Sequence, residues 1–193
     1  TANHTIEAVF AKVEAKPTNP FIDVAEGTYY YDPVLWAVAN GITSGVDATH
    51  FEPEGTCTRA HAVTFLWRAS GQPEPKTTNM PFRDVKPGSY YEKAVLWAVE
   101  NKITNGTTTT TFSPDENCTR AQIVTFLWRS KGEPYASDSN NPFTDIASDY
   151  YMDAVFWAVK EGITKGTTPT TFSPNERCTR AQIVTFIYRA MAS

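Results

Sequence analysis

The chain has 193 residues, of which 41% are hydrophobic, 13% aromatic and 20% charged. This composition can bury a core, which excludes a disordered chain, a collagen-like chain and a small disulfide framework. Its 17 Lys and Arg against 21 Asp and Glu give a formal charge of −4 without basic blocks, so we expect no nucleic-acid partner. The sequence contains neither a recognisable signal peptide nor an apolar stretch of roughly 18 residues, so we expect no membrane insertion.

Three similar units follow a short leader. The same residue types recur at intervals of 60 or 61 residues: Phe21, Phe82 and Phe143; Trp36, Trp97 and Trp157; Arg59, Arg120 and Arg180. Such a fixed period indicates repeated structural units. We place the leader at residues 1–17 and the modules at 18–75, 76–136 and 137–193, with linkers rich in Pro, Ser, Thr, Asn and Lys. Because the chain begins with Thr1, we expect it to be a piece of a longer or processed protein.

The first helix of each unit is predicted from its end signals. In the first unit, Asp32 as N-cap before Pro33 starts the helix and Gly41 stops it. The equivalent helices run over 92–101 and 153–161. Lys102 replaces the stop glycine in the second unit, so that helix end is not fixed by the pattern, although Asn101 tolerates a left-handed conformation.

The second helix of each unit begins at a threonine: Thr58, Thr119 or Thr179. Gln122 and Gln182 complete a Thr-x-x-Gln capping box in the last two units, whereas His61 breaks the pattern in the first. The helices that follow are apolar around most of their circumference, so each needs contacts on several sides. We therefore predict a mainly α fold, in which three helix-loop-helix repeats surround a central three-helix bundle.

The most informative feature is an arginine at the start of each second helix: Arg59, Arg120 and Arg180. A cation there is disfavoured by roughly 0.3–1 kcal/mol because the helix N-terminus is partly positive. A guanidinium beside exposed N-terminal amides would form a site for a carboxylate or phosphate. The alternative is an internal salt bridge to a repeated acid: Asp23, Asp84 or Asp145. A second arginine set complements the dipole at the other helix end and needs no ligand: Arg68, Arg129 and Arg189.

Aromatic residues and glycines are further candidates. Trp36, Trp97 and Trp157 project away from the Val face of the first helix, so they either pack between modules, which we favour, or contact a sugar. The tyrosine pairs before that helix are interpreted as packing residues with a polar tip: Tyr29, Tyr30, Tyr90, Tyr91, Tyr150 and Tyr151. A repeated loop glycine permits positive φ or the close approach of another group: Gly45, Gly106 and Gly166.

Nothing in the sequence indicates catalysis. No histidine recurs across the units, and a phosphate loop, a nucleophile elbow and a metal-binding His pair are all missing, so we expect neither an enzyme nor a metal or cofactor site. Cys57, Cys118 and Cys178 could be redox sensors, a three-thiolate metal site or small buried hydrophobes. Their place before the N-cap favours the last, as hydrophobic staples. The repeated aspartates look like turn or cap residues.

These motifs resemble the S-layer homology domain family. The matching residues are Phe21-Ile22-Asp23-Val24, the tyrosine pair, Val34 to Ile42, the Gly45 loop, Phe51-x-Pro53 and Thr58-Arg59-Ala60, each with counterparts in the other two units. The resemblance spans roughly residues 18–193 and implies a pseudo-threefold, three-pronged spindle. It also implies noncovalent attachment of a bacterial surface protein to secondary cell-wall polysaccharide, which often carries pyruvate ketals on an aminosugar.

The resemblance also implies a binding site. The family's Thr-Arg-Ala-Glu motif falls on Thr58 to His61, Thr119 to Gln122 and Thr179 to Gln182. In the family, the arginine meets the pyruvate carboxylate in grooves between modules, with the loop glycine backbone nearby. The terminal Glu is replaced by Gln twice and by His61 once, and we expect the groove with His61 to bind more weakly, in a pH-dependent way or not at all.

The expected function is a monomeric anchoring module outside the cell, at the wall or S-layer of a Gram-positive bacterium. Its expected partner is a secondary cell-wall polysaccharide with carboxylate or phosphate groups. The leader resembles the last strand of an upstream extracellular β-repeat, which would make this module the C-terminal anchor of a larger surface protein. The alternative is a protein-interaction module that uses the same grooves for an acidic partner segment.

Overall fold

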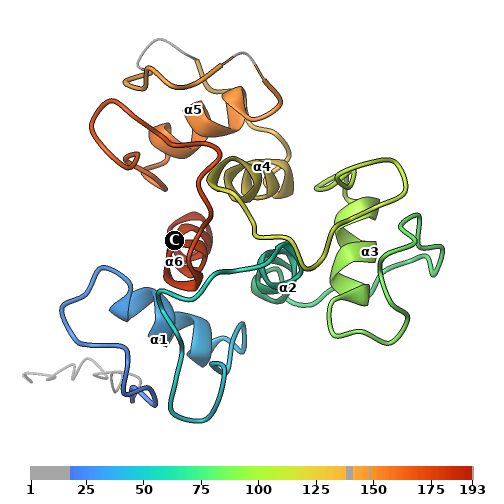
Figure 1. Cartoon of the computed structure of the whole chain (residues 1–193), viewed down its shortest axis with the longest axis horizontal. Helices are drawn as coiled ribbons and strands as arrows, with labels where there is room; N and C mark the ends of the chain where they lie inside the picture. Colours follow the sequence, from blue (N-terminus) through green and yellow to red (C-terminus); the bar gives the residue numbers. More distant parts are fainter. Residues whose placement is uncertain (1–17, 138–140, 148, 193) are drawn as a thin grey trace, which may run out of the picture.

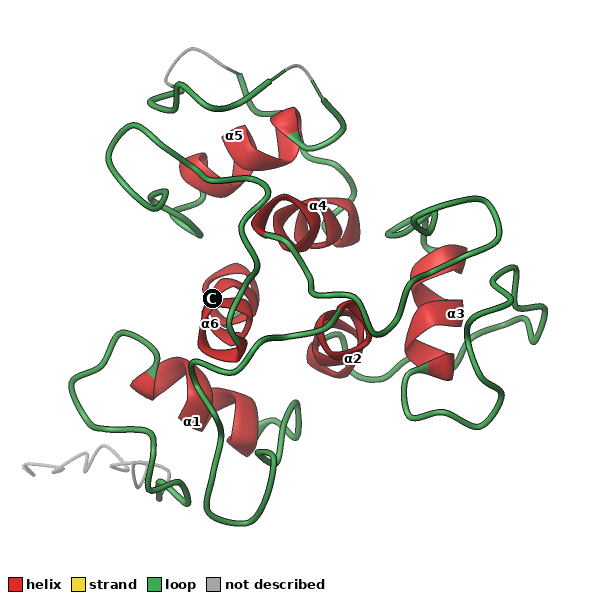
Figure 2. Cartoon of the chain, in the orientation of Figure 1, coloured by secondary structure: helices red, strands yellow, loops and turns green. Residues whose placement is uncertain are grey.

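The structure is a computed structural model that describes residues 18–137, 141–147 and 149–192. The leader, and with it the expectation of an upstream β-strand, lies outside these residues. The described chain forms six helices: α1 (Tyr31–Ala39), α2 (Arg59–Ala69), α3 (Glu92–Glu100), α4 (Arg120–Ser130), α5 (Met152–Lys160) and α6 (Arg180–Met191). Figure 2 shows long loops between them, and the prediction of a mainly α fold of helix-loop-helix repeats is confirmed.

The helices form an inner and an outer set. In Figure 1, α2, α4 and α6 lie around the centre, and α1, α3 and α5 lie outside them in three lobes. The outer helix of each lobe packs on the inner helix of the preceding module, because α3 contacts α2, α5 contacts α4, and α1 contacts α6. The contact between α1 and α6 closes the ring, so the first and last modules are interlocked.

The inner helices begin as predicted. The side chains of Thr58, Thr119 and Thr179 each accept the N–H of the residue three positions on, and the capping box is present in all three modules. In the first module the Nδ1 atom of His61 accepts the Thr58 N–H at 3.4 Å. Histidine therefore replaces glutamine without loss of the cap, although the sequence pattern is broken there.

The outer helices differ from the prediction at their start. Helix α1 begins at Tyr31, and Tyr30 occupies the N-cap position without a side-chain hydrogen bond, so the prediction of Asp32 as N-cap is wrong. The reason is a preceding turn, in which the Tyr31 N–H donates to the Thr28 carbonyl at 3.2 Å. Two helix ends are as expected, with φ of 66° at Gly41 and 69° at Gly162. In the second module Lys102 adopts the left-handed conformation with φ of 58°, whereas Asn101, considered for it from the sequence, has φ of −90°.

The three cysteines join the three modules through their backbones. Their backbones form a closed ring, in which Cys57 donates to Cys178 at 3.2 Å, Cys118 to Cys57 at 2.9 Å and Cys178 to Cys118 at 2.9 Å. All three side chains are fully buried, and burial raises the pKa of the Cys57 and Cys178 thiols to about 12. Within the described residues no group of cysteine, histidine and acid side chains could hold a metal ion. These facts favour small buried hydrophobes over redox sensors, because the reactive thiolate is suppressed.

Candidate binding clefts

Three equivalent clefts open beside the arginines that begin the inner helices. Their volumes are about 410 Å³ beside Arg59, about 400 Å³ beside Arg120 and about 440 Å³ beside Arg180. We name them the Arg59, Arg120 and Arg180 clefts. The structure thus brings the three arginines and the three loop glycines of the sequence hypothesis into clefts, one of each to a cleft.

Every cleft is built from all three modules. In the Arg59 cleft, the arginine comes from α2, the loop around Gly106 and one face of α4 come from the second module, and Tyr150 comes from the third. The other two clefts follow by rotation around the ring, with Tyr29 completing the Arg120 cleft and Tyr90 the Arg180 cleft. No cleft can therefore form from one module alone.

The arginine side chains are buried, and within the described residues they contact carbonyls and aromatic rings without forming an ion pair. Arg59, Arg120 and Arg180 are only 2%, 3% and 6% exposed. The Nε atom of Arg59 donates to the Phe112 carbonyl at 2.9 Å, and its guanidinium lies 4.8 Å from the centre of the Phe112 ring. Arg120 and Arg180 bind Phe172 and Phe51 in the same way. Among the described residues none of these three arginines forms an ion pair.

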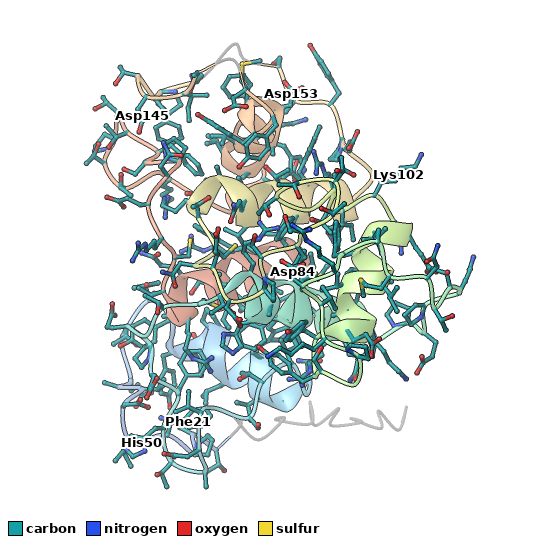
Figure 3. The ribbon with its side chains drawn as sticks, turned by 45° about the vertical axis from the view of Figure 1, so that its right-hand side comes forward. Phe21, His50, Asp84, Lys102, Asp145 and Asp153 are labelled. Atoms are coloured by element: carbon teal, nitrogen blue, oxygen red, sulfur yellow. The ribbon has the colours of Figure 1, made fainter. Side chains whose placement is uncertain are left out.

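The repeated aspartates bind backbone amides instead. Asp84 accepts the N–H of Phe112 at 2.8 Å and of Ser113 at 2.7 Å. Asp23 and Asp145 hold the corresponding turns, and Asp84 and Asp145 lie in separate parts of the molecule in Figure 3. The internal salt bridge considered from the sequence is therefore not formed, and the interpretation of the aspartates as turn residues fits the geometry.

The guanidinium groups keep unused hydrogen-bonding capacity. The Nη2 atoms of Arg59 and Arg180 are buried without a partner among the described residues, and Nη2 of Arg120 donates to Thr164 at a long 3.4 Å. Burial lowers the pKa of each of these arginines. A buried charge without a counter-ion is costly, so an anion in the cleft would relieve a penalty that the fold leaves in place.

The helix amides do not take part, which corrects the sequence hypothesis. The Arg59 N–H donates to the Glu116 carbonyl at 2.8 Å, and the Ala60 N–H to the Pro114 carbonyl at 3.0 Å. Equivalent bonds cap the other inner helices: Arg120 to Glu176, Ala121 to Pro174, Arg180 to Gly55 and Ala181 to Pro53. The turn of the neighbouring module thus uses the amides that the hypothesis left exposed, and only the side chain remains for a ligand.

The loop glycines are required by shape. Gly45, Gly106 and Gly166 have φ of 87°, 82° and 83°, and a Cβ atom on Gly106 would lie 2.5 Å from the Phe82 ring. Each glycine N–H donates to the threonine two positions before it: Thr43, Thr104 and Thr164. The glycines therefore let the loop pass close to a phenylalanine ring of the same module, and their amides are already bonded.

A family model for the S-layer homology domain matches residues 20–63, 81–124 and 142–184. The chain belongs to the S-layer homology domain family. The three matches fall at the three expected repeats, while the module boundaries at 18–75, 76–136 and 137–193 stay a prediction.

The relatives that this chain matches are much longer than the chain itself. The chain is 29% identical over 169 residues to an endoglucanase of Bacillus sp. (strain KSM-635), covering 84% of the chain and 18% of that protein. It is 28% identical to a cellulosome-anchoring protein of Acetivibrio thermocellus, covering 86% of the chain and 37% of the relative. It is 27% identical to a surface-layer 125 kDa protein of Lysinibacillus sphaericus, covering 99% of the chain and 16% of that protein.

Family membership makes the chain a cell-surface anchoring module, which locates it outside the cell, at the wall or S-layer. Across the described ranges, every helix is too short or too polar to cross a membrane.

The tryptophans of the S-layer homology modules line none of the three clefts. Trp97 and Trp157 are 8% and 5% exposed, and the partly buried Trp36 packs edge-on against Tyr188 of α6 at 5.4 Å. This placement favours packing between modules over sugar contact, and we leave the tryptophans out of the proposed site.

Sequence reasoning missed several cleft residues. A second arginine lines each cleft: Arg68, Arg129 and Arg189. From the sequence, the helix dipole alone explained these arginines, and they were not assigned to a binding site. The spacing of Gln122, Thr125 and Arg129 places them on one helix face, which the 3.6-residue period could have revealed. The contribution of Tyr29, Tyr90 and Tyr150 depends on module packing, and no local pattern signals it.

Proposed function

We propose that the three clefts bind an anionic secondary cell-wall polysaccharide and so anchor the protein noncovalently. The observation that supports this proposal is the set of buried arginines that form no ion pair within the described residues, each beside an open cleft. A carboxylate, such as a pyruvate ketal, or a phosphate group would accept hydrogen bonds from the free guanidinium nitrogen. The second arginine of each cleft adds positive charge at the other end.

The number of clefts matters because each contact is modest. A hydrogen bond to a charged group contributes about 1.5–3 kcal/mol, which corresponds to about ten- to a hundredfold in affinity. Clefts that bind the same repeating polymer raise the apparent affinity through effective concentration. Because one chain completes all clefts, we further infer that the protein acts as a monomer.

We infer that the chain itself is not catalytic. Glycoside hydrolysis commonly uses two carboxylates on either side of the scissile bond. The residues that line the Arg59 and Arg120 clefts include no acid, and those of the Arg180 cleft include only Glu52. The clefts are therefore suited to binding rather than to turnover.

The test is sedimentation of the full chain with purified cell walls. Arg59→Gln and Arg120→Gln keep a polar side chain and remove the charge, and we expect each to weaken binding about ten- to a hundredfold and the pair to abolish it. Arg177→Ala removes an exposed cation that lines no cleft and is the matched control. Thermal unfolding of each variant reports whether the fold is retained.

Two results would contradict the proposal. One is full wall binding by the folded double variant. The other is binding that survives removal of the polysaccharide but is lost when wall proteins are digested, because that outcome would favour the acidic protein segment as partner.

A further inference from the structure

The three clefts are not chemically equal at one repeated position. Thr107, which lines the Arg59 cleft, bonds its hydroxyl to that of Ser113 behind it at 2.7 Å, and Thr167 of the Arg120 cleft forms the same pair with Ser173. In the first module, Val46 and Glu52 stand at these two positions, and both line the Arg180 cleft. A hydroxyl pair is therefore replaced by an apolar side chain and a carboxylate.

Glu52 has the same backbone geometry as its counterparts. Its φ is 57°, and Ser113 and Ser173 have φ of 58° and 59°. The turn is held in each module by the repeated aspartate, which accepts the Glu52 N–H at 2.8 Å in the first. The difference between the clefts is thus confined to the side chain. Burial lowers the pKa of the Arg180 guanidinium, and the electrostatic effects of Cys57 and then of Glu52 partly oppose this lowering.

The net charge of the clefts differs as a result. Arg59 and Arg129 line the first cleft without an acid, and Arg120, Lys165 and Arg189 line the second without an acid. In the Arg180 cleft, the negative charge of Glu52 offsets one of the two positive charges of Arg68 and Arg180. Among the residues that line these three clefts, an incoming anion therefore meets a carboxylate only in the Arg180 cleft. Acids outside the lining act on the other two arginines: Glu116 and Asp84 on Arg59, and Glu176 and Asp145 on Arg120.

The capping residue strengthens the contrast. Gln122 and Gln182 accept the threonine N–H with their carbonyl oxygen, which leaves the amide nitrogen as a donor in the Arg59 and Arg120 clefts. His61 uses Nδ1 for the same bond, and its ring lies stacked at 5.7 Å from Tyr90 and 6.3 Å from Phe65. The third cleft thus offers a flat ring where the others offer an amide.

We infer that Glu52 determines the selectivity of the Arg180 cleft by acting as a built-in competitor for the anion, so that the protein binds anionic sugar in two clefts and not in three. This inference rests on the proposed function. The Arg180 cleft would then receive the least charged part of the polymer, while the Arg59 and Arg120 clefts hold the anionic groups.

The experiment counts sites on the full chain with a monovalent probe, an aminosugar glycoside that carries one pyruvate ketal. Isothermal titration calorimetry should give a stoichiometry of two for the natural chain. Glu52→Ser copies the residue of the other modules at an unchanged backbone position, and it should raise the stoichiometry to three, with roughly tenfold or greater strengthening of the third site. Adding Arg180→Ala to that variant should remove the gained site.

The converse and control variants locate the effect. Ser113→Glu should lower the stoichiometry from two to one. Glu54→Ser removes an exposed acid from the same loop that lines no cleft, and it should leave two sites. Three sites in the natural chain, or two sites in Glu52→Ser, would overturn the role of Glu52 and leave the proposed function standing. Absence of binding in the natural chain by this probe and by the same glycoside carrying a phosphate group instead would overturn the proposed function itself.

Discussion

Each cleft arginine and one repeated aspartate bind the backbone of the same phenylalanine. Asp84 accepts the N–H of Phe112, while Arg59 donates to the carbonyl of the same residue. The carboxylate thus fixes the acceptor of the arginine without forming an ion pair with it, and its charge only partly opposes the lowering of the Arg59 pKa by burial. This arrangement orients the guanidinium and keeps it electrostatically unsatisfied, which is the condition for recognising an external anion.

Lys102 provides a stability prediction at the scale of one residue. It lies at the surface after α3, with φ of 58°, where the other modules have Gly41 and Gly162 (Figure 3). A side chain with Cβ costs about 1–2 kcal/mol in this conformation, and glycine costs none. We expect Lys102→Gly to raise the free energy of unfolding by about 1 kcal/mol in urea titrations. The reverse change, Gly162→Lys, should lower it by a similar amount, and equal stability of all three chains would contradict the argument.

His61 provides a prediction of pH dependence. Burial lowers its pKa below the ordinary value of 6.5, and the charge of Arg180 adds to this effect while that of Asp115 opposes it. The unfolded chain therefore takes up the proton more readily than the folded chain. The neutral ring is also needed in the fold, because Nδ1 accepts the Thr58 N–H.

The sign follows from linkage: the contribution of His61 is complete above the unfolded pKa and is lost as the pH falls below about 6.5 toward the folded pKa. Urea unfolding of the natural chain and of His61→Gln between pH 8 and pH 5 should show a larger loss of stability for the natural chain. Profiles that stay parallel over this range would argue against a neutral His61 in the fold.

At the scale of the element, the loop that carries Gly106 can be tested against a glycine of nearly equal conformation. Gly106 and Gly132 have φ of 82° and 83°, but only Gly106 has neighbours, with Phe82 and the Thr108 carbonyl each 2.5 Å from an added Cβ. Gly132→Ala should therefore cost about 1 kcal/mol for the conformation alone. Gly106→Ala should cost about 1–3 kcal/mol more, because the loop must move.

The variants Gly106→Ala and Gly132→Ala also distinguish an effect on stability from an effect on binding. Gly106 lines the Arg59 cleft and Gly132 lines no cleft, so only Gly106→Ala should weaken binding of the pyruvylated probe. Equal unfolding free energies for the two variants would indicate that the loop yields without cost.

The elements that depend on local chemistry were predictable from the sequence, and those that depend on module packing were not. Thr119 and Gln122 carry the helix start in their own side chains, so the capping box was visible as a pattern. The carbonyls that cap Arg59 and Ala60 come from Glu116 and Pro114 of the next module. No local signal announces such a partner, and the helix amides were therefore assigned to a ligand in error.

At the scale of the whole molecule, the closed ring makes every cleft depend on every module. Helix α1 packs on α6, and α5 packs on α4, so removal of the third module exposes apolar faces at both ends of the remaining chain. The same removal takes Tyr150 from the Arg59 cleft, the loop and α6 face from the Arg120 cleft, and the arginine itself from the Arg180 cleft.

We therefore expect a chain of residues 18–136 to lose all three clefts rather than one of them. Circular dichroism should give less helix per residue than the full chain, urea unfolding should lose its cooperativity, and the pyruvylated probe should not bind. A chain of residues 18–193 is the matched control, since every residue that lines the three clefts lies between Tyr29 and Arg189, and it should behave as the full chain does. Cooperative unfolding of 18–136 with an intact Arg59 site would mean that the modules are independent units and that the contact between α1 and α6 contributes little.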